Sequence, residues 1–197
     1  MSVRKEFKII IVLIFTMIFT RKYYEIYRLF GFYLPVLVYF LYSELKPYYS
    51  IHSIVRFTDK FKWHKNLISI VIEYAFLGAI VLCIDKVFIT NGYNEAIDMA
   101  PLFLVYLLFL SISGMALILP KLSVVRGFVF LTIIFILSRC KIKMFYFLQA
   151  LYDSRKWCIS SGIVTTIIIF IAINIIIYSV YFICIKTRME IMEFYEE

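Results

Sequence analysis

Charged residues are scarce in this sequence, and several of its apolar runs contain none at all. Asp, Glu, Lys and Arg make up 17% of the 197 residues, whereas 63% are hydrophobic and the mean hydropathy is +0.91. A soluble domain usually has about a quarter charged residues, because its surface must face water. This composition excludes a soluble protein and predicts a chain embedded in a lipid bilayer.

The residue sets that enzymes and metal sites need are also missing. There is no GxxxxGK[ST] loop to hold nucleotide phosphates, and the two histidines, His52 and His64, lie in a polar stretch. The four cysteines are scattered without a CxxC pair: Cys83, Cys140, Cys158 and Cys184. We therefore expect no enzyme, no metal site and no cofactor bound by this chain. A disulfide between Cys140 and Cys158 is an open alternative to two free thiols.

Acidic residues are outnumbered by basic ones, 13 against 21, which gives a net charge of +8 and a pI near 9.3. The basic residues fall mainly between the apolar runs and form no free basic arm. This placement favours contact with anionic lipid head groups and predicts no nucleic acid partner.

Six apolar runs predict an all-α fold, a polytopic membrane helical bundle that forms a single transmembrane domain over residues 1–197. The expected spans are 9–27, 29–43, 67–84, 99–119, 124–138 and 158–185. The first run starts like a signal peptide but lacks the small residues of a cleavage site, so we expect it to be retained. Pro35 should kink the second span.

Two segments between the spans have patterns of their own. In residues 44–66, apolar side chains recur at helical spacing opposite basic ones, which predicts an amphipathic helix on the membrane surface. Met144 to Leu151 is apolar but too short to cross a bilayer, so we expect a re-entrant or interfacial segment before the last span.

Basic residues are distributed unevenly between the two sides of the expected spans. With the N-terminus inside, 12 Lys and Arg lie on the inner side and 9 on the outer side. Because basic loops stay in the cytoplasm, we expect both termini to be cytoplasmic.

Three polar side chains inside apolar runs are candidates for a translocation path: Glu73 in the third span, and Asn174 and Tyr178 in the last. Ionisable residues in a membrane are costly and often functional, so Glu73 could be a proton or cation site. The alternative is that these groups hydrogen-bond one helix to another.

The order of these elements resembles that of small permease subunits of ABC-2-type transporters. The most particular stretch is SIVRFTDKFKWHKN, Ser53 to Asn66, which resembles a segment before the third span of bacteriocin-associated permeases of Gram-positive bacteria. No single motif is diagnostic, and the expected first two spans are shorter than is usual in that family.

The resemblance implies a bacterial plasma membrane protein that works with a second permease subunit, the same or similar, and with a separate ATP-binding cassette ATPase. ATP and Mg would be bound by that ATPase, and the cargo would be a hydrophobic peptide or lipid-like molecule. Residues 44–66 would be a coupling helix, with four residues at the ATPase contact: Arg56, Asp59, Lys60 and Trp63.

Two other functions are compatible with the same residues. One is a non-transporting membrane interaction or immunity subunit, and the other is an ion-coupled carrier that depends on Glu73. Ser53 to Asn66 could also be a surface helix that binds anionic lipid.

Overall fold

A computed structural model gives the arrangement of most of the chain. It describes residues 3–20, 23–49, 60–85, 99–119, 122–140, 143–151 and 162–193. Within these ranges all regular structure is helical and there are no strands. The expected all-α fold is therefore confirmed.

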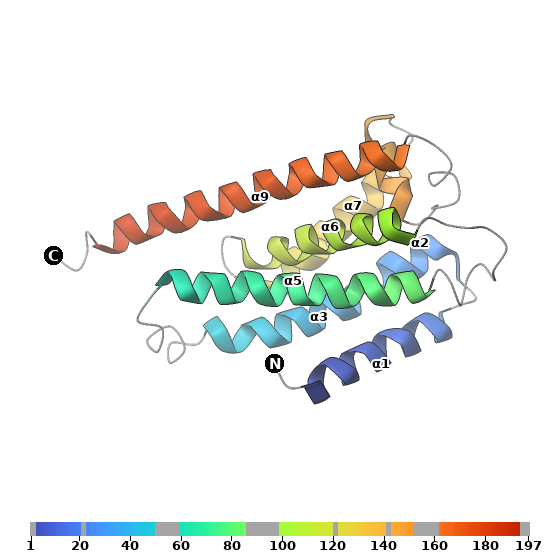
Figure 1. Cartoon of the computed structure of the whole chain (residues 1–197), viewed down its shortest axis with the longest axis horizontal. Helices are drawn as coiled ribbons and strands as arrows, with labels where there is room; N and C mark the ends of the chain where they lie inside the picture. Colours follow the sequence, from blue (N-terminus) through green and yellow to red (C-terminus); the bar gives the residue numbers. More distant parts are fainter. Residues whose placement is uncertain are drawn as a thin grey trace.

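Helical residues occur within each of the six expected spans. The elements are α1 (Val3–Phe19), α2 (Glu25–Tyr27), η1 (Arg28–Tyr33), α3 (Leu34–Leu45), η2 (Lys46–Tyr49), α5 (Lys60–Ile84), α6 (Met99–Ile118), α7 (Val124–Arg139), η4 (Lys143–Leu151) and α9 (Gly162–Glu193). The long helices run in alternating directions along the long axis of the molecule (Figure 1). This alternation is what a chain that crosses a layer repeatedly produces.

Four of the described helices are long and apolar enough to cross a membrane. They are Glu25–Tyr49, Lys62–Ile84, Met99–Ile118 and Ile163–Cys184. The chain is thus a membrane-embedded helical protein. The apolar part of α1, Ile9–Phe19, and the 16-residue α7 are shorter, so six crossings stay a prediction.

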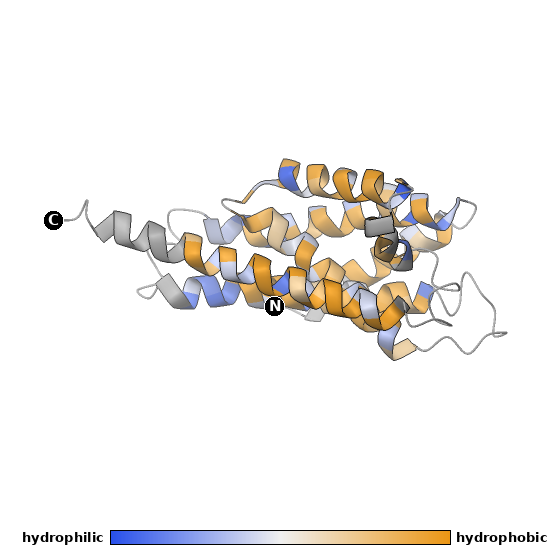
Figure 2. Ribbon diagram, turned by 90° about the horizontal axis from the view of Figure 1, so that it is seen from above, coloured by the Kyte–Doolittle hydropathy of each residue, from blue (hydrophilic) through white to orange (hydrophobic). Residues whose placement is uncertain are grey.

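Apolar residues dominate the length of the helices, and hydrophilic ones gather toward their ends (Figure 2). At the centre is α6, which packs against α5 and α9, and 67% of its apolar stretch is buried. By contrast, 17% of the apolar stretch of α9 is buried, so most of that helix faces outward. The core is therefore formed around α6, with α9 attached along one side.

Glycines let these central helices approach closely. A Cβ at Gly114 of α6 would lie 2.6 Å from Val71 Cγ1 of α5, and one at Gly127 of α7 would lie 2.6 Å from Leu117 Cδ2 of α6. Small residues at such crossings are typical of membrane helix packing. Gly31 differs from them, because it is exposed and a methyl group added there would have nothing within 4 Å.

The first expected span, 9–27, is interrupted in the structure. Helix α1 ends at Phe19, and a new helical segment begins at Glu25 after an extended Tyr24. The guanidinium of Arg28 turns back and donates to the Met17 carbonyl, 3.2 Å away. The last carbonyls of a helix lack backbone partners, so this contact stabilises the end of α1 where the sequence predicts a continuous helix.

Pro35 is accommodated by a local change in helix type. The preceding six residues, Arg28–Tyr33, form a π-helix, and the Leu34 amide bonds to the Leu29 carbonyl five residues back. Proline has no amide hydrogen and clashes with the carbonyl four residues earlier, which a wider turn relieves. Pro35 is the second residue of α3 and directly follows this π-helical turn, and the kink itself stays a prediction.

The two segments between spans are partly described. Residues 50–59 lie outside the described part, while 44–49 continue the preceding helix and 60–66 form the first turns of α5. The expected re-entrant segment, Met144 to Leu151, lies within the nine-residue 3₁₀ helix η4, which packs on α7 and α9. Cys158 lies outside the described residues.

Candidate functional site

Two clusters of polar contacts lie at opposite ends of α5. The helix has 25 residues, so the ends are about 37 Å apart at 1.5 Å per residue. One cluster surrounds Trp63 and His64 at its start, and the other surrounds Asp85 directly after its end. Both join α5 to helices that are distant in the sequence.

At the start of α5, Trp63 connects this helix to the end of the second helical segment. Its indole Nε1 donates to the Tyr48 carbonyl at 2.9 Å, and its ring packs edge-on against Tyr49 with centroids 5.1 Å apart. The resemblance places Trp63 at a contact with an ATPase. In the structure its indole is partly buried and bonds within the chain.

His64 extends this contact to α9. Its Nδ1 lies 2.8 Å from the hydroxyl of Tyr181, which is itself buried, and the His64 ring packs edge-on against both Trp63 and Tyr181. We call Tyr48, Tyr49, Trp63, His64 and Tyr181 the aromatic clamp. The clamp holds three helical segments together at one end of the bundle.

The clamp also joins the two ends of the segment that the resemblance places at a contact with an ATPase. Tyr48 and Tyr49 precede residues 50–59 and Trp63 follows them, so the two flanks of this segment are bonded to each other. Arg56 and Asp59 lie outside the described residues. Lys60 is the first residue of α5, and its side chain is not described.

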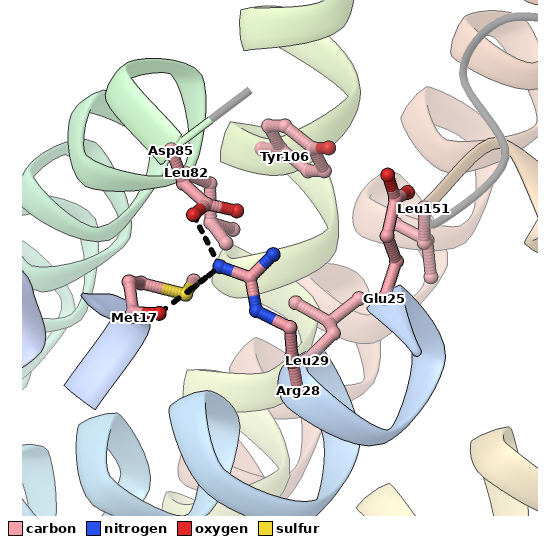
Figure 3. Close-up of a pocket in the computed structure, with 8 residues that line it drawn as sticks. All are labelled: Met17, Glu25, Arg28, Leu29, Leu82, Asp85, Tyr106 and Leu151. Atoms are coloured by element: carbon pink, nitrogen blue, oxygen red, sulfur yellow. Dashed lines mark hydrogen bonds and ion pairs between the residues drawn. The ribbon is translucent and has the colours of Figure 1, made fainter. Parts of the chain in front are cut away.

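At the other end of α5, Asp85 forms a buried ion pair with Arg28. Arg28 Nη2 is 2.5 Å from Asp85 Oδ1, and the two side chains are 3% and 8% exposed. The same nitrogen also contacts the Met17 carbonyl and lies 3.7 Å from the Met17 sulfur. Arg28 therefore ties α1, η1 and α5 together (Figure 3).

A small cavity of about 20 Å³ lies beside this ion pair. Its lining consists of Met17, Glu25, Arg28, Leu29, Leu82, Asp85, Tyr106 and Leu151 (Figure 3). That volume has room for about one water molecule. Arg28 Nε is buried and has no hydrogen-bond partner among the described residues. Among the described residues, the charged pair thus has room beside it for about one small polar molecule.

Sequence reasoning missed this ion pair, although one signal was available. Arg28 and Asp85 each border an apolar run, and the expected topology puts both on the outer side of the membrane. Two opposite charges at the same depth are candidates for pairing. Hydropathy and charge counts do not reveal which helices are neighbours.

Asn174 and Tyr178, two of the expected path residues, bond α9 to α6. Asn174 Nδ2 donates to the Leu108 carbonyl of α6 at 3.1 Å and to the Phe170 carbonyl of its own helix at 2.8 Å. The Tyr178 hydroxyl lies 2.9 Å from Ser111 Oγ. These contacts agree with the alternative interpretation of the sequence, in which polar side chains hydrogen-bond one helix to another and do not line a translocation path.

Glu73 is placed differently from these two residues. Glu73 is exposed on α5, whereas Asn174 is buried against α6. The structure therefore does not bring Glu73 together with the other two expected path residues. Its carboxylate accepts a hydrogen bond from Ser69 Oγ of the same helix, 3.2 Å away.

Metal ligands do not converge in the described part of the chain, where no group of three or more His, Cys, Asp or Glu side chains could hold an ion. Comparisons with protein families, with curated proteins and with solved structures find no match to this chain.

Proposed function

We propose that this chain is the membrane-spanning subunit of an ATP-driven transporter of the bacterial plasma membrane, with ATP hydrolysed by a separate subunit. The single observation that supports this is the aromatic clamp. A membrane subunit moved by an external ATPase needs a contact segment that is mechanically joined to its helices. Trp63 and His64 join the flanks of residues 50–59 to α5, to the preceding helical segment and to α9.

In this mechanism the ATPase touches residues 50–59, which carry Arg56 and Asp59, with Lys60 next to them at the start of α5. Closure of the ATPase displaces this segment, and the clamp transmits the displacement to three helices together. The cargo is a hydrophobic peptide or a lipid-like molecule, exposed to one side of the membrane and then the other. Direction is set by the different affinities of the two states for the cargo.

The first test is purification of the tagged chain from its native membrane in a mild detergent. We expect a stoichiometric ATPase to accompany it, and we expect ATP hydrolysis by that complex to respond to the membrane subunit. A chain that is isolated without any ATPase, although still folded and monodisperse, contradicts the proposal.

The second test separates assembly from coupling. Trp63→Phe keeps an aromatic ring but removes the donor to Tyr48. We expect the ATPase to stay bound while ATP-dependent transport falls, because the contact segment is no longer fixed to α5. Tyr39→Phe, at a residue of α3 that is 60% exposed, is the matched control and should leave both unchanged.

A second candidate is a non-transporting interaction or immunity subunit. It is favoured by the use of Asn174 and Tyr178 as bonds between α9 and α6, which leaves these side chains engaged rather than facing a path. This candidate predicts stable membrane complexes without ATP-dependent transport. Transport measured in vesicles that contain the purified complex distinguishes the two.

A further inference from the structure

Glu73 occupies an unusual position for a carboxylate in a membrane helix. It is the middle residue of the candidate span Lys62–Ile84. Its side chain is exposed, and it accepts a hydrogen bond from Ser69 on the same helix. Charged groups at mid-membrane usually face a bundle interior or pair with another group.

Glu73 belongs to a line of exposed residues on one side of α5. These are Lys62, Asn66, Ser69, Glu73 and Phe76, which we call the Glu73 stripe. The spacing alternates between four and three residues, so all five lie on one helix face. Lys62 and Asn66 belong to the polar first turns of α5, whereas Ser69 and Glu73 lie inside the apolar run, where Ile72 and Phe76 are exposed beside them. An exposed carboxylate at that position is not what a lipid-facing surface contains.

The exposed face of α9 shows what a lipid-facing surface of this protein looks like. Large exposed side chains there are Val164, Ile168, Ile171, Ile175, Ile176, Val180, Phe182 and Ile183. In its apolar stretch, Ile163–Cys184, no charged residue occurs. The contrast within one molecule argues that lipid covers α9 but that protein covers the stripe on α5.

A second copy of this chain is a poor occupant of that face. A two-fold dimer formed through this face, with both copies in the same orientation in the bilayer, would set the two stripes against each other in parallel around an axis normal to the membrane. Glu73 would then oppose Glu73, and Lys62 would oppose Lys62, so like charges would meet at two depths. A partner helix with a basic side chain at that depth avoids this repulsion and pairs the carboxylate.

We propose that the Glu73 stripe is the docking surface for a transmembrane helix of a different subunit, which places a basic side chain opposite Glu73 near the middle of the membrane. Phe76 supplies the apolar contact one turn away, and Ser69 holds the carboxylate in place. This inference does not rest on the transport function, because it concerns assembly of the membrane part.

The test is site-specific crosslinking of the full chain in its native membrane. A photoreactive benzophenone analogue replaces Phe76, which is 49% exposed, or Phe182 on α9, which is 46% exposed, as the matched control. We expect the analogue at position 76 to join a different polypeptide, and the analogue at position 182 to give lipid adducts. The peptide joined at position 76 should be an apolar helix with Lys, Arg or His within about one turn of the adduct.

Charge reversal then tests the chemistry of the contact. Glu73→Lys should lower the crosslinking yield by about threefold or more, because an average interhelical polar contact in a membrane corresponds to about threefold and the reversed charge adds repulsion. Replacing the partner's basic residue by Glu, in combination with Glu73→Lys, should restore the crosslinking yield. Glu73→Gln, which is less disruptive to folding, should give an intermediate yield.

Several outcomes would overturn the inference. They are an adduct with a second copy of this chain, an adduct within the same chain, lipid adducts alone at position 76, and a partner helix that has no basic residue at that depth. Yields that do not respond to either substitution at Glu73 would count against it equally. Because ATPase copurification is measured separately, failure here does not bear on the proposed transport function.

Discussion

The two ends of α5 are fixed by different kinds of interaction. At its start, the aromatic clamp uses neutral hydrogen bonds and ring contacts between partly buried residues such as Trp63 and His64. At its end, Arg28 and Asp85 form an ion pair that is almost fully buried. Both connect three segments, but they differ in what a perturbation costs.

That difference bears on movement. Aromatic pairs are favourable in both offset-stacked and edge-to-face arrangements over a range of centroid distances, so the clamp can follow a small displacement of a neighbour. A buried ion pair has no comparable intermediate, since separating its charges without solvent leaves each of them isolated in an apolar medium. We infer that the clamp end suits the transmission of a movement, whereas the Arg28–Asp85 end holds its helices in a fixed arrangement.

The largest expected effect comes from breaking the ion pair on one side. Arg28→Met removes the cation beside the buried Asp85 carboxylate, and it also removes the donor to the Met17 carbonyl. We expect a loss of about 3–5 kcal/mol in the free energy of unfolding. Unfolding of the purified protein in mixed micelles of increasing denaturing detergent measures this loss.

The double variant Arg28→Met with Asp85→Leu is the control for charge. It removes both charges together, so we expect it to recover much of the stability lost in the single variant. If the double variant is as unstable as Arg28→Met alone, the contact with Met17 rather than the ion pair is the stabilising interaction.

Between the two ends, the packing of α5 on α6 sets the next largest effect. Gly114→Ala puts a methyl group 2.6 Å from Val71 Cγ1 and 3.1 Å from Leu41 Cδ2. We expect a cost of about 1–3 kcal/mol, since both neighbours are buried and must move. Gly31→Ala, where a methyl group meets nothing within 4 Å, is the matched control and should change stability by less than about 0.5 kcal/mol. Equal losses in the two variants would contradict the close helix crossing.

The clamp should give smaller losses than the ion pair. Trp63→Phe and Tyr181→Phe each remove one hydrogen bond, and we expect each to cost about 0.5–1.5 kcal/mol. Trp63 and Tyr181 both contact His64, so their effects should not add, whereas Trp63→Phe and Arg28→Met, at opposite ends of α5, should add within about 0.5 kcal/mol. A double-mutant cycle for each pair, measured by the same unfolding assay, checks both expectations.

Hydropathy predicts the helices well because each apolar run is long and bordered by charged or polar residues. It places the start of the third span at Leu67, whereas α5 begins at Lys60. The polar residues 60–66 carry no apolar signal, although they continue the same helix. Counted from Leu67, Glu73 is six residues into the apolar run, whereas it is the middle residue of the candidate span Lys62–Ile84.

The contacts between helices are harder to predict. Arg28 and Asp85 are 57 residues apart, and their pairing depends on which helices become neighbours. The same holds for His64 and Tyr181, which are 117 residues apart. Asn174 and Tyr178 stand out in the sequence as polar residues in an apolar run, but the choice between a path and a helix contact requires their partners on α6.

The smallest effect is expected where α9 joins α6, away from both ends of α5. Asn174→Leu removes the bond to the Leu108 carbonyl, while that carbonyl keeps its place in the helix. Interhelical hydrogen bonds in membranes average about 0.6 kcal/mol, because the separated helices also find polar partners. We therefore expect a loss near that value, well below that of Arg28→Met. A loss of several kcal/mol would mean that Asn174 has a further partner within the bundle, whereas no loss at all would contradict its role in joining α9 to α6 and would return this residue to consideration as part of a translocation path.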